Sequence, residues 1–140
     1  ANRKSDTQEI GIGFSWPQLL GNGSLLPNYY FGSLWPSTSH SNHSGCGGFI
    51  HVFGLAYDFE VPDFWPQGKE QVFRLSGDIT YNDGFGGASH DWSHVVLGAS
   101  TNLRTGHITI TPSLNFQISM DDSVNDEDEI WCGVNVTYRF

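Results

Sequence analysis

Apolar and polar residues alternate along most of this chain with a period of two. The longest unbroken example is "HITITPSLNFQISM", residues 107–120, where every second side chain is apolar. Successive side chains of a β-strand point to opposite sides, so this period indicates strands with one apolar face. No stretch keeps the period of 3.6 residues that an amphipathic helix requires. The pattern predicts an all-β protein.

Several of the alternating stretches exceed ten residues, whereas strands of soluble proteins are usually about 5–6 residues long. Strands that cross a membrane need about 9–11 tilted residues. The stretches therefore have the length of membrane strands. Seven of them are expected to be strands: 9–16, 28–35, 48–61, 71–81, 92–103, 107–120 and 130–140.

Short and long connections alternate between the predicted strands. The connection at 102–106 is tight, whereas those at 82–91 and 121–129 are long and rich in glycine or acidic residues. Outer-membrane barrels alternate short periplasmic turns with longer external loops in the same way. The sequence therefore predicts an antiparallel up-and-down β-barrel of the outer-membrane type, or the C-terminal part of one. About seven to eight strands would form one domain over residues 1–140.

The odd strand count raises a difficulty, because single-chain bacterial barrels have an even number of strands. A strand has been overlooked, or further strands precede Ala1, or another chain completes the sheet. The abrupt polar start "ANRKSDTQE" favours further strands before Ala1, so that the barrel domain would be incomplete at its N-terminus.

A soluble β-sandwich is the competing fold, because its strands also alternate apolar and polar residues. Aromatic residues near strand ends favour the barrel, since amphipathic rings form girdles at both membrane interfaces. These aromatic residues are Trp16, Trp35, Trp65, Tyr81, Trp92, Trp131 and Tyr138.

Charge excludes one class of partner. The chain has 6 Lys and Arg residues against 15 Asp and Glu, giving a net charge of -9. Nucleic-acid binding depends on basic side chains at the phosphates, so we expect no nucleic-acid partner. The two cysteines, Cys46 and Cys132, fit one disulfide bridge or two unrelated thiols, and two cysteines are too few for a disulfide scaffold.

Three clusters of potential metal ligands were weighed, and none predicts a metal site. The loop "HSNHSGC" holds His40, His43 and Cys46 without a fourth ligand. In "HDWSH", Asp91 and His94 are expected on opposite faces of a strand. The acidic stretch 121–129 lacks the ligand spacing of a calcium loop and is expected to be a solvated surface loop.

Polar residues on the predicted strands suggest a lumen rather than a catalytic centre. Ser, His and Asp occur without the context of a nucleophile or triad, so no enzyme and no cofactor is predicted. We expect Arg74 and Arg139 against Asp78 to set charge selectivity, while Asn115 and Gln117 bond water or solute. The predicted lumen-lining residues are Arg74, Asp78, Asn115, Gln117 and Arg139.

Several segments resemble a group of uncharacterised bacterial outer-membrane, porin-like β-barrel proteins. These segments are "SWPQLLG" (15–21), "GFIHVFGLAYDF" (48–59), "YNDG" (81–84), "HDWSHVVLGAST" (90–101), "ITITPSLNFQISMDDSVNDEDEIW" (108–131) and the final "VTYRF". The resemblance implies a barrel in the bacterial outer membrane, in contact with lipid and without enzymatic activity. Passive passage of small solutes, or a structural role at the cell surface, would be its function. Members of the group are usually longer than 140 residues.

The chain ends with an alternation that resembles an outer-membrane assembly signal. Val136, Tyr138 and Phe140 occupy alternate positions, and this arrangement implies recognition by the barrel-assembly machinery. The alternative function is a secreted or periplasmic β-sandwich that binds glycan or protein through exposed aromatic residues and acidic loops.

Overall fold

The computed structural model describes residues 7–17, 24–36, 47–61, 71–88, 90–122 and 127–140. These residues form eight strands and one short 3₁₀ turn, η1, at Phe85–Gly87. The described part of the chain contains no helix that is long and apolar enough to span a membrane. The strands are β1 (Thr7–Ser15), β2 (Leu25–Pro36), β3 (Gly48–Val61), β4 (Gln71–Asp83), β5 (His90–Thr101), β6 (Leu103–Thr105), β7 (Ile108–Ser119) and β8 (Glu129–Tyr138).

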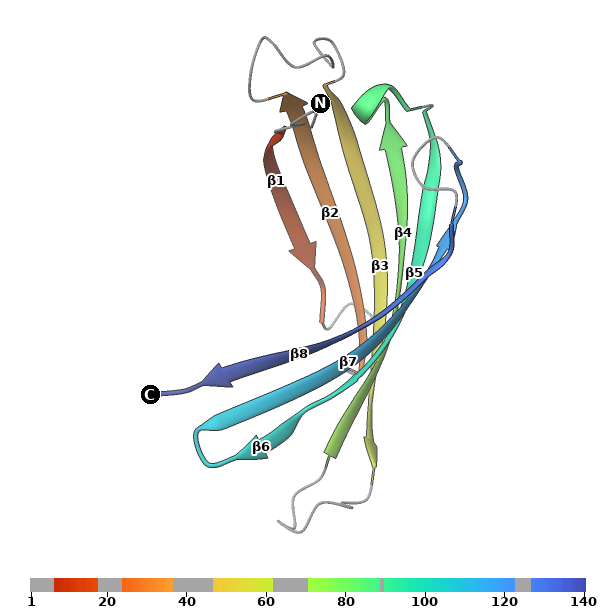
Figure 1. Cartoon of the computed structure of the whole chain (residues 1–140). Helices are drawn as coiled ribbons and strands as arrows, with labels where there is room; N and C mark the ends of the chain where they lie inside the picture. Colours follow the sequence, from red (N-terminus) through yellow and green to blue (C-terminus); the bar gives the residue numbers. More distant parts are fainter. Residues whose placement is uncertain (1–6, 18–23, 37–46, 62–70, 89, 123–126) are drawn as a thin grey trace, which may run out of the picture.

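All eight strands belong to one antiparallel sheet that curls into a half-barrel (Figure 1). Each strand pairs with the next along the chain, except that β5 and β6 both pair with β7. Asn102 separates β5 from β6, which continues the same pass of the chain along β7. The chain therefore crosses the sheet seven times, and the prediction of an antiparallel barrel-type sheet is confirmed.

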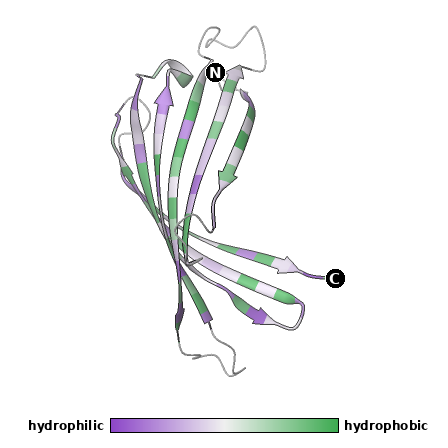
Figure 2. Cartoon of the chain, turned by 180° about the vertical axis from the view of Figure 1, so that it is seen from behind, coloured by the Kyte–Doolittle hydropathy of each residue, from purple (hydrophilic) through white to green (hydrophobic). Residues whose placement is uncertain are grey.

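Register places the apolar residues of neighbouring strands on a common face. Tyr57 of β3 lies opposite Leu75 of β4, and Leu75 lies opposite Ala99 of β5. The row continues through Leu114 of β7 to Cys132 of β8. The alternating hydropathy of each strand is visible along the ribbons in Figure 2. One face of the whole sheet is therefore apolar, as the alternation predicts.

The apolar face is the convex one. Most of its large side chains are exposed, from Ile118 at 38% to Ile130 at 70%, whereas Phe31, Phe73 and Ile79 are half-buried. Among the described residues only two apolar side chains, Leu34 and Ala56, are buried, and both lie on the other face. Thr80 and Asn82, also on that face, are buried too, because a curled sheet crowds the side chains on its concave side.

The described residues form a single layer, with no second sheet packed on either face. A β-sandwich needs two sheets whose inner faces interdigitate. The sandwich alternative is therefore not the architecture that the described residues adopt.

A β-bulge at Ser93 corrects one prediction about β5. The register shifts between Thr80 and Tyr81, so that Thr80 pairs with His94 and Tyr81 pairs with Trp92. The extra residue, Ser93, is buried at 2% exposure. The bulge turns Trp92 to the convex face and puts Asp91 on the same concave face as His94. The expectation that these two residues lie on opposite faces is wrong.

The two edges of the sheet, β1 and β8, are not paired with each other in the described part of the chain. Six antiparallel pairings separate them, so β1 and β8 run in the same direction. Figure 1 shows their separation, with β8 pointing away from β1 at the lower left. Within the described residues, the half-barrel is therefore open between β1 and β8.

Candidate functional site

The concave face carries the polar residues that the sequence analysis selected. Arg74 and Asp78 lie on β4, and Asn115 and Gln117 lie on β7. In register, Asn115 lies opposite Gly98 and Trp131, and Gln117 opposite Val96 and Glu129. Arg139 follows β8, where its backbone N–H donates to the His107 carbonyl at 2.9 Å. The first four residues share one face of the sheet, while their role in lining a lumen remains a prediction.

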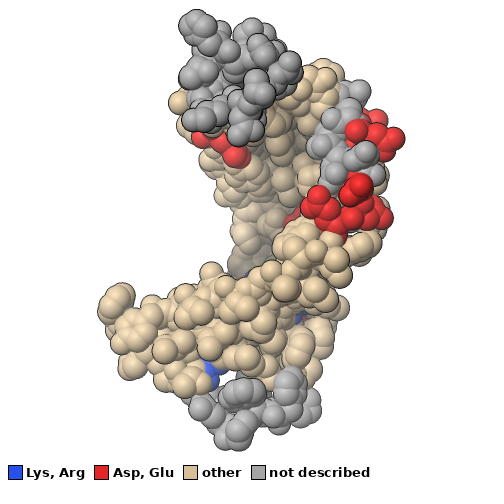
Figure 3. Space-filling view, viewed as in Figure 1, with Lys and Arg blue, Asp and Glu red and all other residues tan. Residues whose placement is uncertain are grey.

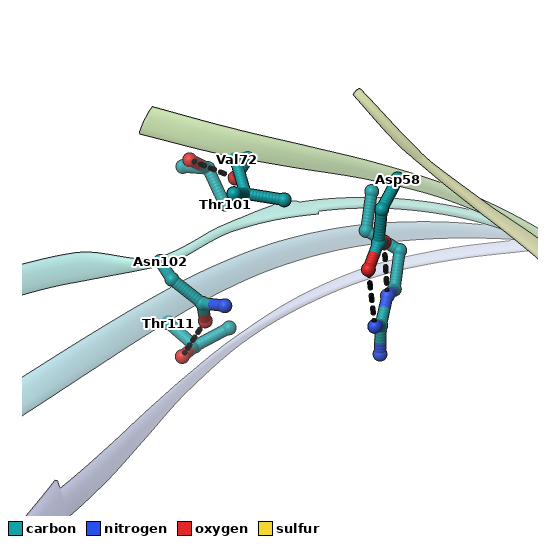
Figure 4. A network of polar contacts seen from close by, with 6 residues as sticks. Asp58, Val72, Thr101, Asn102 and Thr111 are labelled. Atoms are coloured by element: carbon teal, nitrogen blue, oxygen red, sulfur yellow. Dashed lines mark hydrogen bonds and ion pairs between the residues drawn. The ribbon is translucent and has the colours of Figure 1, made fainter. Parts of the chain in front are cut away.

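Arg74 is paired with Asp58, which the sequence analysis did not select. The two residues lie directly opposite each other on β4 and β3. The Arg74 guanidinium donates from Nε to Asp58 Oδ1 at 2.7 Å and from Nη2 to Oδ2 at 2.8 Å (Figure 4). This two-pronged geometry is the strong form of an arginine–carboxylate pair. The structure thus gives Arg74 an ion-pair partner in Asp58, while the expected role of Arg74 and Arg139 against Asp78 in charge selectivity stays a prediction.

Asp78 shares the middle of the concave face with Asn28 and a glycine. Gly54 lies between Asn28 of β2 and Asp78 of β4 in the same register row. A Cβ at Gly54 would collide with the Asp78 carboxylate and the Asn28 amide. Both side chains therefore extend over the glycine, which leaves them room that any other residue would fill.

The same arrangement recurs two register rows away, at the next positions that face the concave side. A Cβ at Gly98 of β5 would meet Ser76 Oγ of β4 and, at 2.9 Å, Asn115 Oδ1 of β7. Polar side chains of β4 and β7 thus lean toward each other across the glycine. The middle of the concave face is a surface of carboxylate, amide and hydroxyl groups, with the chemistry to bond water or polar solutes.

Tyr30 extends this polar surface to the edge strand. Its ring lies over Gly11 of β1, where a Cβ would collide with it. Its hydroxyl donates to Glu9 Oε1 on β1. This contact fixes the edge strand β1 to β2 through side chains as well as through the backbone ladder.

Short polar links occupy the end of the sheet where β4 and β5 meet. Asn82 accepts from the Phe85 N–H at 2.8 Å through its Oδ1 and so holds η1 in place. His90 contacts Asp83, and Ser93 Oγ contacts His94 Nδ1 at 2.8 Å. These contacts are structural, and they bring no three potential metal ligands together.

No group of three or more His, Cys, Asp or Glu that could hold a metal ion occurs among the described residues. The loop with His40, His43 and Cys46 lies outside them, as do residues 123–126 of the acidic stretch. Within that stretch, Asp128 Oδ1 accepts from the Ser119 N–H at 3.0 Å, which links the residue before β8 to the end of β7.

Charge is distributed unevenly along the sheet (Figure 3). In this view acidic side chains gather in the upper part, whereas basic side chains appear only toward the lower end. The acidic residues near one end of the sheet include Asp83 at the end of β4, and Asp121, Asp122 and Asp128 near the β7–β8 connection. Arg74 lies near the start of β4, and Arg139 follows the end of β8. The two ends of the half-barrel therefore differ in charge.

Three residues that shape the concave face were not selected from the sequence: Asp58, Asn28 and Gly54. Asp58 lies on the predicted strand 48–61, and its charge opposite to that of Arg74 on the next predicted strand is the signal that could have revealed the pair. Asn28 was placed only at the end of a predicted strand, although β2 begins three residues earlier at Leu25.

Comparison of the chain with protein-family models, curated proteins and solved structures finds no match. The fold and the residues of the concave face therefore carry the functional argument.

Proposed function

We propose that this chain forms a sector of an outer-membrane β-barrel that serves passive passage of small solutes or a structural role at the cell surface. The observation that carries the proposal is the contrast between the two faces of the sheet. Large apolar side chains dominate the convex face and most are exposed, whereas the concave face combines polar and small residues with fewer apolar ones, such as Val52, Val96 and Trp131. A barrel in a bilayer has this distribution, with lipid outside and a polar interior.

The spacing of aromatic residues supports the same proposal. On β3, Phe49 and Phe59 mark the two ends of the convex face, with Leu55 between them. The ten residue steps between these rings span ~33 Å along a strand. At the ~40° tilt of barrel strands this length covers ~25 Å, the height of an outer-membrane apolar band.

His51 lies among aromatic rings on the convex face, and one of its two ring nitrogens has a hydrogen-bond partner. His51 Nδ1 lies 2.8 Å from the Tyr29 hydroxyl. The rings of Phe31 and Tyr81 stand 5.1 and 6.2 Å from the His51 ring, centroid to centroid. A polar side chain that faces hydrocarbon costs free energy unless it is hydrogen-bonded, so the pairing suits an apolar environment.

The concave face would supply the transport chemistry. Asp78, Asn28, Ser76 and Asn115 offer hydrogen-bonding groups along the middle of the sheet. Whether they line an open channel depends on the number of strands in the closed barrel, since about eight strands leave an interior filled by side chains. The resemblance to porin-like outer-membrane proteins agrees with this role.

Detergent dependence tests the membrane proposal. The full chain should fold and remain monodisperse only in detergent or lipid, and its mobility on a gel should change when the sample is heated. A chain that is folded and monodisperse in plain buffer would overturn the proposal, because an exposed apolar face of this extent would then be compatible with water.

The proposed assembly signal predicts a separate effect at Phe140. This residue is fully exposed and packs mainly against Tyr138, with ring centroids 5.1 Å apart. Deleting Phe140 should leave refolding into detergent unchanged but reduce insertion by the barrel-assembly machinery several-fold. Equal losses in both measurements would show that the ring stabilises the fold and is no assembly signal.

A further inference from the structure

Asp78 lies in the middle of the concave face without a partner for its charge. Its strand, β4, is paired with β3 on one side and with β5 on the other. Within the described part of the chain, no residue donates a hydrogen bond to the half-buried Asp78 carboxylate or forms an ion pair with it. A charged group withdrawn from bulk water is usually paired or bound to a cation. Asp78 is therefore the position on this face where a cation would be stabilised.

The groups beside this carboxylate also offer oxygen atoms. A Cβ at Gly54 would collide with Asp78 Oδ1 and with Asn28 Oδ1, so both oxygens lie above the same glycine. Two register rows away, Ser76 Oγ and Asn115 Oδ1 meet above another glycine. Carboxylate, carbonyl and water oxygens are the ligands of hard cations, and they can replace part of the hydration shell of an ion in a pore.

We propose that Asp78 and the Asn28 amide form a cation subsite in the barrel interior, so that small cations pass in preference to anions. Carboxylates that line a pore favour cations in this way, whereas Arg and Lys favour anions. This selectivity rests on the membrane function proposed above and assigns the class of solute to it.

The cation subsite does not depend on what covers the edges of the sheet. Asn28, Gly54 and Asp78 come from β2, β3 and β4, and each of these strands has a described neighbour on both sides. Strands that cover β1 or β8 therefore leave these three residues in the same register.

The basic residues of the described chain do not cancel the charge of Asp78. Arg74, on the same strand and face, is engaged by Asp58 through two hydrogen bonds. Arg104 lies opposite Thr109. Thr109 is eight residues along β7 from Gln117, the β7 residue in the register row of Asp78, a separation of roughly 27 Å. Arg139 lies farther still, beyond the end of β8.

Other acidic residues lie on the concave face between Asp78 and one end of the sheet. Asp91 of β5 stands opposite Asn82 near the end of β4, and Glu9 of β1 stands opposite Leu34 near the end of β2. Figure 3 shows acidic side chains in this upper part of the molecule. A passage lined by one sign of charge concentrates ions of the opposite sign. Cations that enter from this end would therefore be attracted toward Asp78.

The reversal potential of single channels tests the cation subsite directly. The full chain, refolded in detergent, is inserted into planar bilayers under a gradient of KCl, and the potential gives the permeability ratio of K⁺ to Cl⁻. We expect a ratio above one. Asp78→Asn keeps the shape of the side chain and removes its charge, so the ratio should fall about fivefold, the effect on occupancy of a carboxylate at about 4 Å in water. An unchanged ratio would overturn the subsite, since the charge would then be cancelled from elsewhere.

A charge outside the strands provides the matched control. Asp122 is exposed and follows β7. Asp122→Asn removes the same charge and should leave the ratio unchanged at about 1 M KCl, where the screening length is about 3 Å. An equal fall for both variants would show that net charge sets the selectivity and would overturn the subsite.

Two alanine variants test the geometry without changing any charge. Gly54→Ala should displace the Asp78 carboxylate and the Asn28 amide, and so lower the ratio although the carboxylate remains. Gly13→Ala, also on the concave face, would have Tyr30 Cδ2 at 3.8 Å, an ordinary contact, and should keep the ratio of the unmodified chain. A folded Gly54→Ala variant with the same ratio as Gly13→Ala would overturn the role of this position.

Detergent dependence and insertion into the bilayer are recorded on the same samples. Inserted protein that does not conduct, or that prefers Cl⁻, overturns the cation subsite and leaves the membrane fold in place. A chain that is folded and monodisperse in plain buffer overturns the membrane function as well.

Discussion

The convex and concave faces of this sheet are made by the same strands, yet they follow different rules. On the convex face, apolar residues succeed one another across all seven passes, from Ile12 of β1 to Val136 of β8, with their side chains exposed. The concave face is heterogeneous: it combines an ion pair, amides, hydroxyls and glycines beneath them.

The difference indicates which constraint acts on each face. A uniform environment such as lipid requires only that a side chain be apolar, so one apolar residue can replace another at neighbouring positions. A crowded concave face asks for particular sizes and partners, because each side chain must fit beside those of the next strand. We therefore expect substitutions on the convex face and on the concave face to change stability in different ways.

The largest difference in stability between the two faces is expected when lysine is introduced at either of two adjacent positions of β7. Leu114 is 52% exposed on the convex face, and Asn115 follows it on the concave face. Leu114→Lys should reduce the free energy of unfolding in lipid vesicles by about 2–4 kcal/mol, because a charge then faces hydrocarbon. Asn115→Lys should cost less than about 1 kcal/mol, since an aqueous interior accepts the charge.

Denaturant titration of both variants in the same vesicles measures this contrast. A change of similar size at both positions would mean that the two faces do not meet different solvents. A loss confined to Asn115→Lys would indicate that the concave face is the dry one.

A smaller contrast is expected between two glycines. Gly48 lies on the concave side beneath η1, and a Cβ there would collide with the backbone of Phe85 and Asp83. Gly77 lies on the convex side, where a Cβ would have Leu97 Cδ2 at 3.5 Å, an ordinary contact. Gly48→Ala should cost about 1–3 kcal/mol through overpacking.

Gly77→Ala is the matched control and should be neutral, or stabilising by about 0.4–1 kcal/mol through the entropy of the unfolded chain. Denaturation midpoints in the same detergent compare the two variants. Equal midpoints for both alanines would indicate that η1 moves away without cost and that the concave end is loosely packed.

The convex face could be predicted from sequence almost residue by residue, because alternation alone determines it. The strands at 48–61 and 71–83 also appear where the pattern places them, within two residues at their ends. The concave face could not be predicted in the same way. Which residues meet there depends on register, and a single bulge at Ser93 reverses the phase of β5 for Asp91 and Trp92.

Curvature and closure lie beyond alternation for a related reason. The period of two states which side each residue faces, but it is the same for a flat sheet, a half-barrel and a closed barrel. The break at Asn102, where Thr111 Oγ1 donates to the Asn102 side chain at 2.7 Å, gave no signal in the hydropathy pattern. The sequence analysis therefore identified strand faces but not the partner of Arg74.

The smallest effect, and the most informative about the interior, is expected at the Arg74–Asp58 pair. The Arg74 side chain is 48% exposed and that of Asp58 25%, so water screens the pair. Arg74→Gln, Asp58→Asn and the double variant should give a coupling free energy of about 0.2–1 kcal/mol at low salt. In a water-filled channel, 1 M salt should remove most of it, because ions reach the pair. In an interior filled by side chains the coupling should persist.

A control cycle pairs the exposed Arg104 with Asp58, and the effects of these two substitutions should be additive within about 0.5 kcal/mol. Coupling that resists salt would therefore argue for a filled barrel and against passage of solutes, while leaving the membrane fold itself in place.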